Sequence, residues 1–265
     1  SFGQGFRFPT ITERFIKTGV GNFGVFPNPD LLPESSWNAE VGFKQGIKLG
    51  KMLAYLDAAV FWQEYQNTIE YMFGIWDVAN APASFAGFKF LNTGASRVIG
   101  LDISFVGTAK FSKNFELTFL TGYNYIVPKT LNPDYVYAVD DINRQYSYNT
   151  TSMDSASQIL KYRFLHNIKF DAEATIFSKF SLGVSAKYFS KIVNMDAIIK
   201  DFEETTANSG GDKQNIRYMD YFNAHRFGNW IFDTRLSYAF SPSHKVAVVA
   251  SNILNRSYSL RPLKI

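Results

Sequence analysis

Residues 115–125 read Phe115-Glu116-Leu117-Thr118-Phe119-Leu120-Thr121-Gly122-Tyr123-Asn124-Tyr125. Bulky apolar or aromatic residues take every second position, and charged, polar or small residues mostly fill the positions between them. Successive side chains of a β-strand point to opposite faces of its sheet, so this alternation predicts a strand with one apolar and one polar face. Strands of this kind fit a sheet with lipid on one side and a water-filled lumen on the other.

The same alternation recurs along the chain and predicts about nine strands. Their expected ranges are 1–8, 36–48, 52–72, 88–110, 115–125, 158–176, 180–188, 228–240 and 244–258. Short turns near residues 50, 113, 178 and 242 alternate with long connections over 9–35, 74–87, 129–157 and 192–227. Soluble sandwiches also alternate in this way, but rarely with strands this long. The predicted fold is therefore all-β, an antiparallel transmembrane β-barrel segment with short periplasmic turns and long extracellular loops.

The composition agrees with this fold class. Aromatic residues make up 17% of the 265 residues, yet the mean hydropathy is only −0.12, because lipid-facing and lumen-facing positions average out along each strand. No run of about 18 apolar residues predicts a transmembrane helix. Cysteine is absent, which excludes disulfides and thiol catalysis. The net charge of +4 is mild and argues against nucleic-acid binding.

The two ends of the chain suggest a longer natural product. The sequence begins at Ser1 inside a strand-like run and stops at Ile265 shortly after another strand. An outer-membrane protein needs an export signal, and none is present in these residues. We therefore expect this chain to be a fragment.

Four short segments carry a family resemblance. They are Ser1-Phe2-Gly3-Gln4-Gly5-Phe6-Arg7-Phe8-Pro9 with Glu13, Asn28-Pro29-Asp30-Leu31-Leu32-Pro33-Glu34 followed by Glu40-Val41-Gly42, Asn92-Thr93-Gly94-Ala95 with Gly100-Leu101-Asp102, and Asn252-Ile253-Leu254-Asn255 with Tyr258 and Arg261-Pro262. Each motif is weak alone, but their order and spacing over residues 1–262 resemble the barrel of TonB-dependent outer-membrane receptors. The third motif departs from the family pattern, since Asp102 stands where Glu is commoner.

The resemblance implies that residues 1–265 are the C-terminal portion of a single barrel domain of about 22 strands, which encloses an N-terminal plug. It implies an outer-membrane receptor of a Gram-negative bacterium that imports a scarce nutrient with energy from the TonB complex. The nutrient would be an iron–siderophore, haem, cobalamin or an oligosaccharide. Expected partners are this ligand, outer-membrane lipid and lipopolysaccharide, and the TonB complex through a region outside the chain. No cofactor and no nucleic acid are expected.

Four charged residues near these motifs are candidates for the lumen wall, where a plug could pair with them. They are Arg7, Glu34, Glu40 and Asp102. The alternative for each is a scaffold role without ligand contact.

The long loops hold candidates for ligand contact, because mixed aromatic and charged side chains on surface loops suit adaptable recognition. They are Trp76 and Phe85 in the 74–87 loop, Tyr135, Tyr137, Asp140, Asp141, Arg144 and Tyr146 in the 129–157 loop, and Tyr221, His225 and Arg226 in the 192–227 loop. Ordinary solvated loops are the alternative interpretation.

No catalytic or metal-binding grouping emerges from the sequence. The chain has three histidines, and neither a nucleophile elbow nor a phosphate-binding loop is present. An enzyme is therefore disfavoured. A passive porin or structural outer-membrane barrel remains the alternative to a gated receptor.

Overall fold

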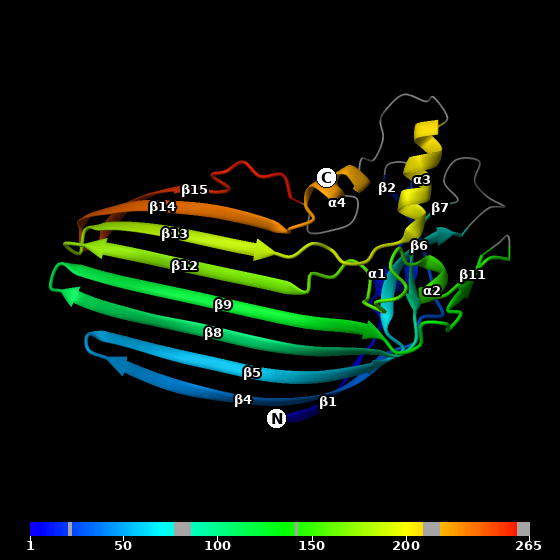
Figure 1. The fold of residues 1–265 in the computed structure, drawn as a ribbon, viewed down its shortest axis with the longest axis horizontal. Helices are drawn as coiled ribbons and strands as arrows, with labels where there is room; N and C mark the ends of the chain where they lie inside the picture. The colour runs from blue at the N-terminus through cyan, green and yellow to red at the C-terminus, as the bar shows by residue number, and fades with distance from the viewer. Residues whose placement is uncertain (21–22, 77–85, 141–142, 209–217, 259–265) are drawn as a thin grey trace.

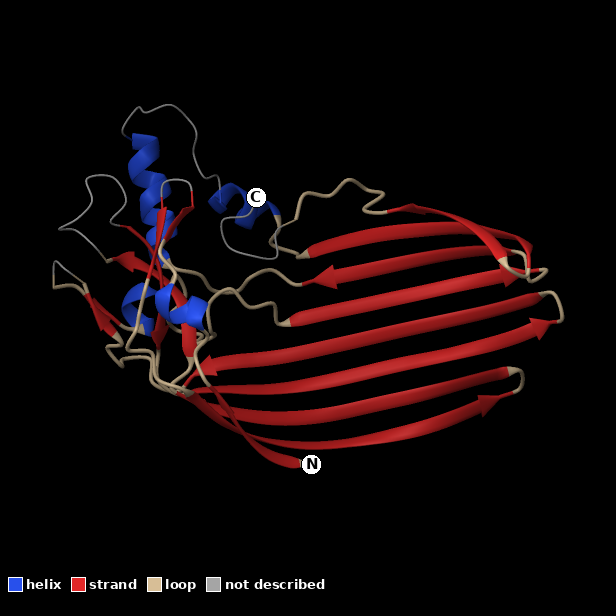
Figure 2. Ribbon diagram, turned by 180° about the vertical axis from the view of Figure 1, so that it is seen from behind, coloured by secondary structure: helices blue, strands red, loops and turns tan. Residues whose placement is uncertain are grey.

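A computed structural model describes residues 1–20, 23–76, 86–140, 143–208 and 218–258. Its largest element is a nine-stranded antiparallel sheet, a wall of long strands lying side by side (Figures 1 and 2). In order across the sheet the strands are β1 (Phe2–Arg7), β4 (Glu34–Leu49), β5 (Met52–Gln66), β8 (Ser96–Ser112), β9 (Phe115–Thr130), β12 (His166–Ile176), β13 (Phe180–Phe189), β14 (Asn229–Ser241) and β15 (His244–Ala250). The all-β antiparallel prediction is confirmed, and this sheet is open, with β1 and β15 at its edges.

The connections between these strands fall into two sets. Two- or three-residue turns join β4 to β5, β8 to β9, β12 to β13 and β14 to β15 at one end of the wall, which we call the short-turn edge. The remaining connections leave from the opposite end, the long-loop edge, and all the helices and smaller strands lie there (Figure 2). The predicted alternation of short and long connections is therefore confirmed.

The pairing register extends the sequence alternation across the whole sheet. Val60 of β5 pairs with Val41 on one side and Leu101 on the other, and Tyr123 of β9 pairs with Ile103 and Ile168. These residues and those in line with them form the apolar face of the wall. Its aliphatic side chains are strongly exposed, for example Val41 at 81% and Val248 at 66%. A contiguous apolar surface of this extent marks a face that contacts an apolar phase or partner.

The opposite, polar face carries ion pairs that cross the strands. Arg235 of β14 donates from Nη1 and Nη2 to the two carboxylate oxygens of Asp171, each at 2.8 Å, and from Nε to Glu173 at 2.7 Å. To reach β12 it passes over Gly183 of β13, where a Cβ atom would lie 2.4 Å from Arg235 Nε. Glycine is therefore required at this position by the side chain that lies across it.

A second sheet lies beyond the long-loop edge. Its strands, in order, are β2 (Thr18–Val20), β3 (Phe23–Phe26), β7 (Ala86–Asn92) and β6 (Ile69–Ile75). The chain leaves the wall at Asn67, with φ 54°, and returns to it at Gly94, with φ 91°. Both are left-handed backbone positions that Asn and Gly tolerate. The predictions of single strands over 52–72 and 88–110 were therefore wrong, because each range holds two strands of different sheets.

Two further strand predictions were too long. Residues 158–165 precede β12 as an irregular segment with positive φ at Gln158 and Tyr162. β15 ends at Ala250, and a turn follows in which Asn255 N donates to Asn252 O at 2.7 Å. In both places local backbone reversals end the pairing that the alternation predicted.

The long connections are folded segments. The first contains α1 (Ile11–Phe15), the third contains the hairpin of β10 (Ala138–Val139) and β11 (Gln145–Tyr146) followed by α2 (Tyr148–Thr151), and the fourth contains α3 (Ala197–Asn208) and α4 (Tyr218–Ala224). Within the described residues no helix is both long and apolar enough to cross a membrane. Among the described residues, small buried clusters pack Phe73 against Phe88 and Met195 against Ile199.

Candidate functional site

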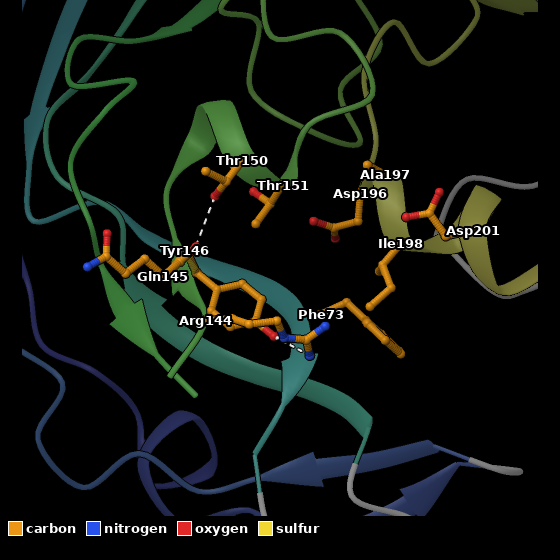
Figure 3. A pocket seen from close by; sticks show the side chains of 10 residues that line it. All are labelled: Phe73, Arg144, Gln145, Tyr146, Thr150, Thr151, Asp196, Ala197, Ile198 and Asp201. Carbon is orange, nitrogen blue, oxygen red and sulfur yellow. Dashed lines mark hydrogen bonds between the residues drawn. The ribbon is translucent and has the colours of Figure 1, made fainter. Parts of the chain in front are cut away.

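A cleft of about 400 Å³ opens among the folded loops at the long-loop edge. Strand β6, the end of the β10–β11 hairpin, α2 and the first turns of α3 surround it (Figure 3). Its lining residues are Phe73, Arg144, Gln145, Tyr146, Thr150, Thr151, Asp196, Ala197, Ile198 and Asp201. This volume is within the range of cavities that hold small-molecule ligands.

A three-residue network forms one side of the cleft. The buried carboxylate of Asp140 accepts from Arg144 N and Nε, both at 2.8 Å, and from Tyr146 OH at 3.0 Å. Arg144 Nη2 in turn donates to Tyr146 OH at 3.2 Å. Burial raises the pKa of Tyr146, and its hydrogen bond to Asp140 raises it further, so the phenol stays neutral. The network holds one guanidinium beside one phenol in the lining of the cleft.

Helix α2 presents hydroxyl groups to the same cleft. Ser147 caps the helix by accepting from Thr150 N at 3.2 Å, while Thr150 Oγ1 accepts from Ser147 N at 2.9 Å. This reciprocal capping box satisfies two backbone donors of a very short helix. It thereby fixes the positions of Thr150 and Thr151 (Figure 3).

Behind the cleft, a buried ion pair joins two segments that are far apart in sequence. Lys161 Nζ donates to Asp196 Oδ1, and the two side chains are only 2% and 1% exposed. Tyr162 OH also donates to Asp196, at 2.8 Å, and Lys161 donates to Thr151 Oγ1. Burial lowers the pKa of Lys161, although Asp196 opposes this shift. The pair ties the start of α3 to α2 and so fixes the width of the cleft.

A second ion pair connects the small sheet to the same region. Arg163 Nη2 donates to Glu70 Oε1 of β6 at 2.6 Å. Burial raises the pKa of Glu70, and Arg163 and Lys161 only partly oppose this effect. Together the two ion pairs connect β6, α2 and the start of α3 to the segment 158–165.

Chemically, the cleft combines an apolar side with groups that donate and accept hydrogen bonds. Phe73, Ala197 and Ile198 supply apolar surface, while Arg144 and Asp201 supply charge. No group of His, Asp and Glu within the described residues could hold a metal ion. The arrangement suits an organic ligand that has both apolar and polar parts.

Two of the predicted ligand residues, Arg144 and Tyr146, line this cleft, and two more, Asp140 and Trp76, contact them from outside its lining. Asp140, Arg144 and Tyr146 form the network described above, and the ring of Trp76 packs against Tyr146 with 5.2 Å between centroids. Trp76 Nε1 also donates to Gly87 O at 3.1 Å.

The other predicted ligand residues have different surroundings. Tyr137 is half-buried behind the cleft, with its OH 3.0 Å from Thr151 Oγ1, and burial raises its pKa. Tyr135 is exposed and does not line the cleft. Asp141 and Phe85 lie outside the described residues.

Three predicted residues lie apart from the cleft, in α4 or directly after it. The rings of Tyr221 and His225 stack with centroids 4.0 Å apart, and His225 Nε2 lies 2.9 Å from Ser257 O. The guanidinium of Arg226 lies 4.7 Å from the ring of Phe227. The structure does not bring these side chains to the cleft.

The four predicted lumen residues all occupy the polar face of the wall. Arg7 contacts both Glu34 and Glu13, and Glu34 Oε1 also accepts from Ile69 N at 2.6 Å. Asn124 donates to Asp102 at 3.4 Å, and Glu40 is exposed.

Sequence reasoning missed most of the cleft lining. The missed residues are Phe73, Gln145, Thr150, Thr151, Asp196, Ala197, Ile198 and Asp201. They come from three connections that have no shared motif, so nothing local signals that they meet.

Comparisons with known proteins agree with this architecture. Residues 1–255 match the family model described as TonB dependent receptor-like, beta-barrel. No curated protein sequence matches the chain.

Solved structures of low sequence identity share the fold. The haemophore receptor HasR of Serratia marcescens, solved with its haemophore HasA and haem, is 17% identical with a TM-score of 0.55 over 97% of this chain and 34% of that one. The ferric-catecholate import receptor Fiu of E. coli K12 is 16% identical with a TM-score of 0.52 over 98% and 29%. The siderophore receptor PirA of Pseudomonas aeruginosa is 13% identical with a TM-score of 0.51 over 97% and 36%. The chain thus spans about a third of the length of these receptors.

Proposed function

The chain belongs to the TonB-dependent receptor β-barrel family, and from that premise we propose that it forms part of an outer-membrane receptor for active nutrient import. The receptor binds a scarce extracellular nutrient and takes it up with energy from the TonB complex. Members of this family are receptors and transporters, and no enzymatic activity is proposed. The residues 1–265 form the C-terminal portion of its single barrel domain.

The two faces of the wall support its place in the outer membrane of a Gram-negative bacterium. The exposed apolar face contacts lipid, and the polar face, with its ion pairs around Arg235, faces the lumen. The short-turn edge is then periplasmic and the long-loop edge extracellular, as in other outer-membrane barrels. On the lumen side, Glu40 and Asp102 are available to contact a plug, while Arg7 and Glu34 already bind each other.

The observation that carries the proposal is the cleft of about 400 Å³ in the folded loops. It lies at the edge where an incoming ligand arrives first, and its lining is fixed by the Asp140–Arg144–Tyr146 network and the buried Lys161–Asp196 pair. A pre-formed lining lowers the ordering cost of binding. A passive porin needs no such built site.

The substrate class is proposed at the level of the family. The solved relatives are described as receptors for a haemophore with haem, a siderophore and a ferric catecholate. We assign this chain a ligand from the same group of scarce nutrients, which comprises an iron–siderophore, haem, cobalamin or an oligosaccharide.

Binding to isolated outer membranes distinguishes the receptor from a porin. Outer membranes that contain the natural-length protein are titrated with each radiolabelled candidate nutrient, with no energy source present. One candidate is expected to bind saturably, and Arg144→Ala is expected to weaken it, while Tyr135→Ala, outside the cleft, leaves it unchanged. If none of the candidates binds saturably while the protein still conducts small solutes, the porin is the correct assignment.

A further inference from the structure

Three charged residues stand out on the otherwise uncharged apolar face of the wall. They are Glu64 of β5, Arg97 of β8 and Lys129 of β9, and the register pairs Glu64 with Arg97 and Arg97 with Lys129. The same register places every other charged residue of the nine strands on the polar face. The three therefore form one contiguous row across neighbouring strands, which we call the Glu64–Arg97–Lys129 row.

The row lies at the long-loop edge, where the apolar band ends. Arg97 is the second residue of β8 and Lys129 the last but one of β9. One step further along the same face, Ile99 pairs with Trp62 and Val127. The guanidinium of Arg97 lies 4.5 Å from the centre of the Trp62 ring. Tryptophan at the end of an apolar band is typical of the membrane–water interface.

The row carries an excess positive charge. Glu64 Oε1 accepts from Arg97 Nε at 2.8 Å and contacts Nη2 at 2.7 Å, and Trp62 Nε1 donates to the same oxygen at 3.2 Å. Arg97 is thus held in one orientation, and none of its described contacts uses Nη1. Lys129 is exposed and has no ion-pair partner among the described residues. One carboxylate therefore faces two cations on a surface that borders lipid.

We propose that Arg97 and Lys129 bind a phosphate group of an anionic lipid headgroup in the outer leaflet, with acyl chains lying against Trp62 and Ile99. This inference uses the orientation given under the proposed function, with the long-loop edge outside. A lysine at an apolar boundary extends its ammonium towards the headgroup layer, and an arginine with a free edge accommodates phosphate oxygens. In the outer leaflet the fitting lipid is lipopolysaccharide, through the phosphates of its lipid A.

The binding site is tested on the natural-length receptor purified in detergent and stripped of lipid. Native mass spectrometry measures binding of purified bis-phosphorylated lipid A and of the same lipid with both phosphates removed. Each basic residue near an anionic lipid surface contributes about fivefold in affinity. The Arg97→Gln/Lys129→Gln double variant is therefore expected to bind the phosphorylated lipid about 30-fold more weakly, and the dephosphorylated lipid as the unchanged receptor does.

Two comparisons make the result decisive. A Lys44→Gln/Lys110→Gln variant removes two lysines of similar exposure from the polar face (66% and 69%), and it is expected to keep its lipid A affinity. Lys129→Gln alone is the fallback if the double variant fails to fold, and about a fivefold loss is expected for it. An unchanged lipid A affinity in the Arg97→Gln/Lys129→Gln variant or in Lys129→Gln would overturn the proposal. A loss of the same size in the Lys44→Gln/Lys110→Gln control would also overturn it. Displacement of the lipid by inorganic phosphate at the lipid's own concentration would also overturn it, because the site would then be one for a small anion. None of these readouts depends on nutrient uptake, so the test is separate from that of the proposed function.

Discussion

Replacing Lys161 by Met is expected to loosen the loops that set the width of the cleft. The side chains of Lys161 and Asp196 are 2% and 1% exposed, so the substitution leaves a buried carboxylate without its cation. Removing one partner of such a pair costs about 3–5 kcal/mol. Local opening is then expected to become about 10²- to 10⁴-fold more frequent. Neither residue belongs to the nine-stranded sheet, so the wall should remain folded.

Hydrogen–deuterium exchange on the natural-length receptor measures the effect. Peptides covering residues 148–165 and 192–200 should lose protection in Lys161→Met, while peptides from β8 and β9 should not. Lys113→Met, in an exposed turn, is the matched control. The Lys161→Met/Asp196→Asn double variant removes both charges and keeps an acceptor for Tyr162, so most of the protection should return. If the single variant behaves like Lys113→Met, or if the double variant is as unprotected as the single one, the reasoning is refuted.

Three further outcomes are expected. Gly183→Ala places a Cβ atom 2.4 Å from Arg235 Nε, and thermal unfolding should show the wall destabilised by about 1–3 kcal/mol. Gly122→Ala is the control and should leave the stability unchanged, because its Cβ atom would lie 4.0 Å from the nearest atom, Ile103 O. Burial raises the pKa of Glu70 above 4.5 in the folded protein. The neutral carboxyl group therefore contributes to the stability of the small sheet below pH 4.5, and this contribution is lost as the pH rises through the raised pKa. Exchange protection of β6 and β7 should therefore fall from pH 4.5 upwards, and Glu70→Gln should flatten this dependence. Arg144→Ala should weaken ligand binding about tenfold or more. Arg144→Lys should not restore it, because an ammonium cannot reproduce the planar guanidinium that bonds Asp140 through Nε and Tyr146 through Nη2; full affinity in either variant would remove Arg144 from the site.

The wall could be predicted from the sequence because its alternation reflects two different environments. Each strand has one apolar face and one polar face, so apolar and polar residues alternate along the chain wherever a strand crosses the wall. The predictions over 52–72 and 88–110 were wrong for the same reason. Alternation continues through Ile69–Ile75 and Ala86–Asn92, which are also strands, and only long-range pairing assigns them to a different sheet.

The candidate site was less predictable from the sequence. Asp140, Arg144 and Tyr146 are close in sequence, and their mixed charged and aromatic character pointed to recognition. Asp196 and Phe73 reach the same cleft from connections about 120 residues apart along the chain, and no local pattern marks them. Tyr221 and His225 have the same composition signal, but the fold places them at α4, with each other as partners.

Energy-dependent uptake tests the central claim most directly. Cells that carry the natural-length receptor are given the nutrient that binds saturably, and uptake is measured before and after a protonophore collapses the inner-membrane energy source. We expect surface binding to persist and uptake to stop. Uptake that continues at the same rate after collapse would contradict active import and would favour a passive pore.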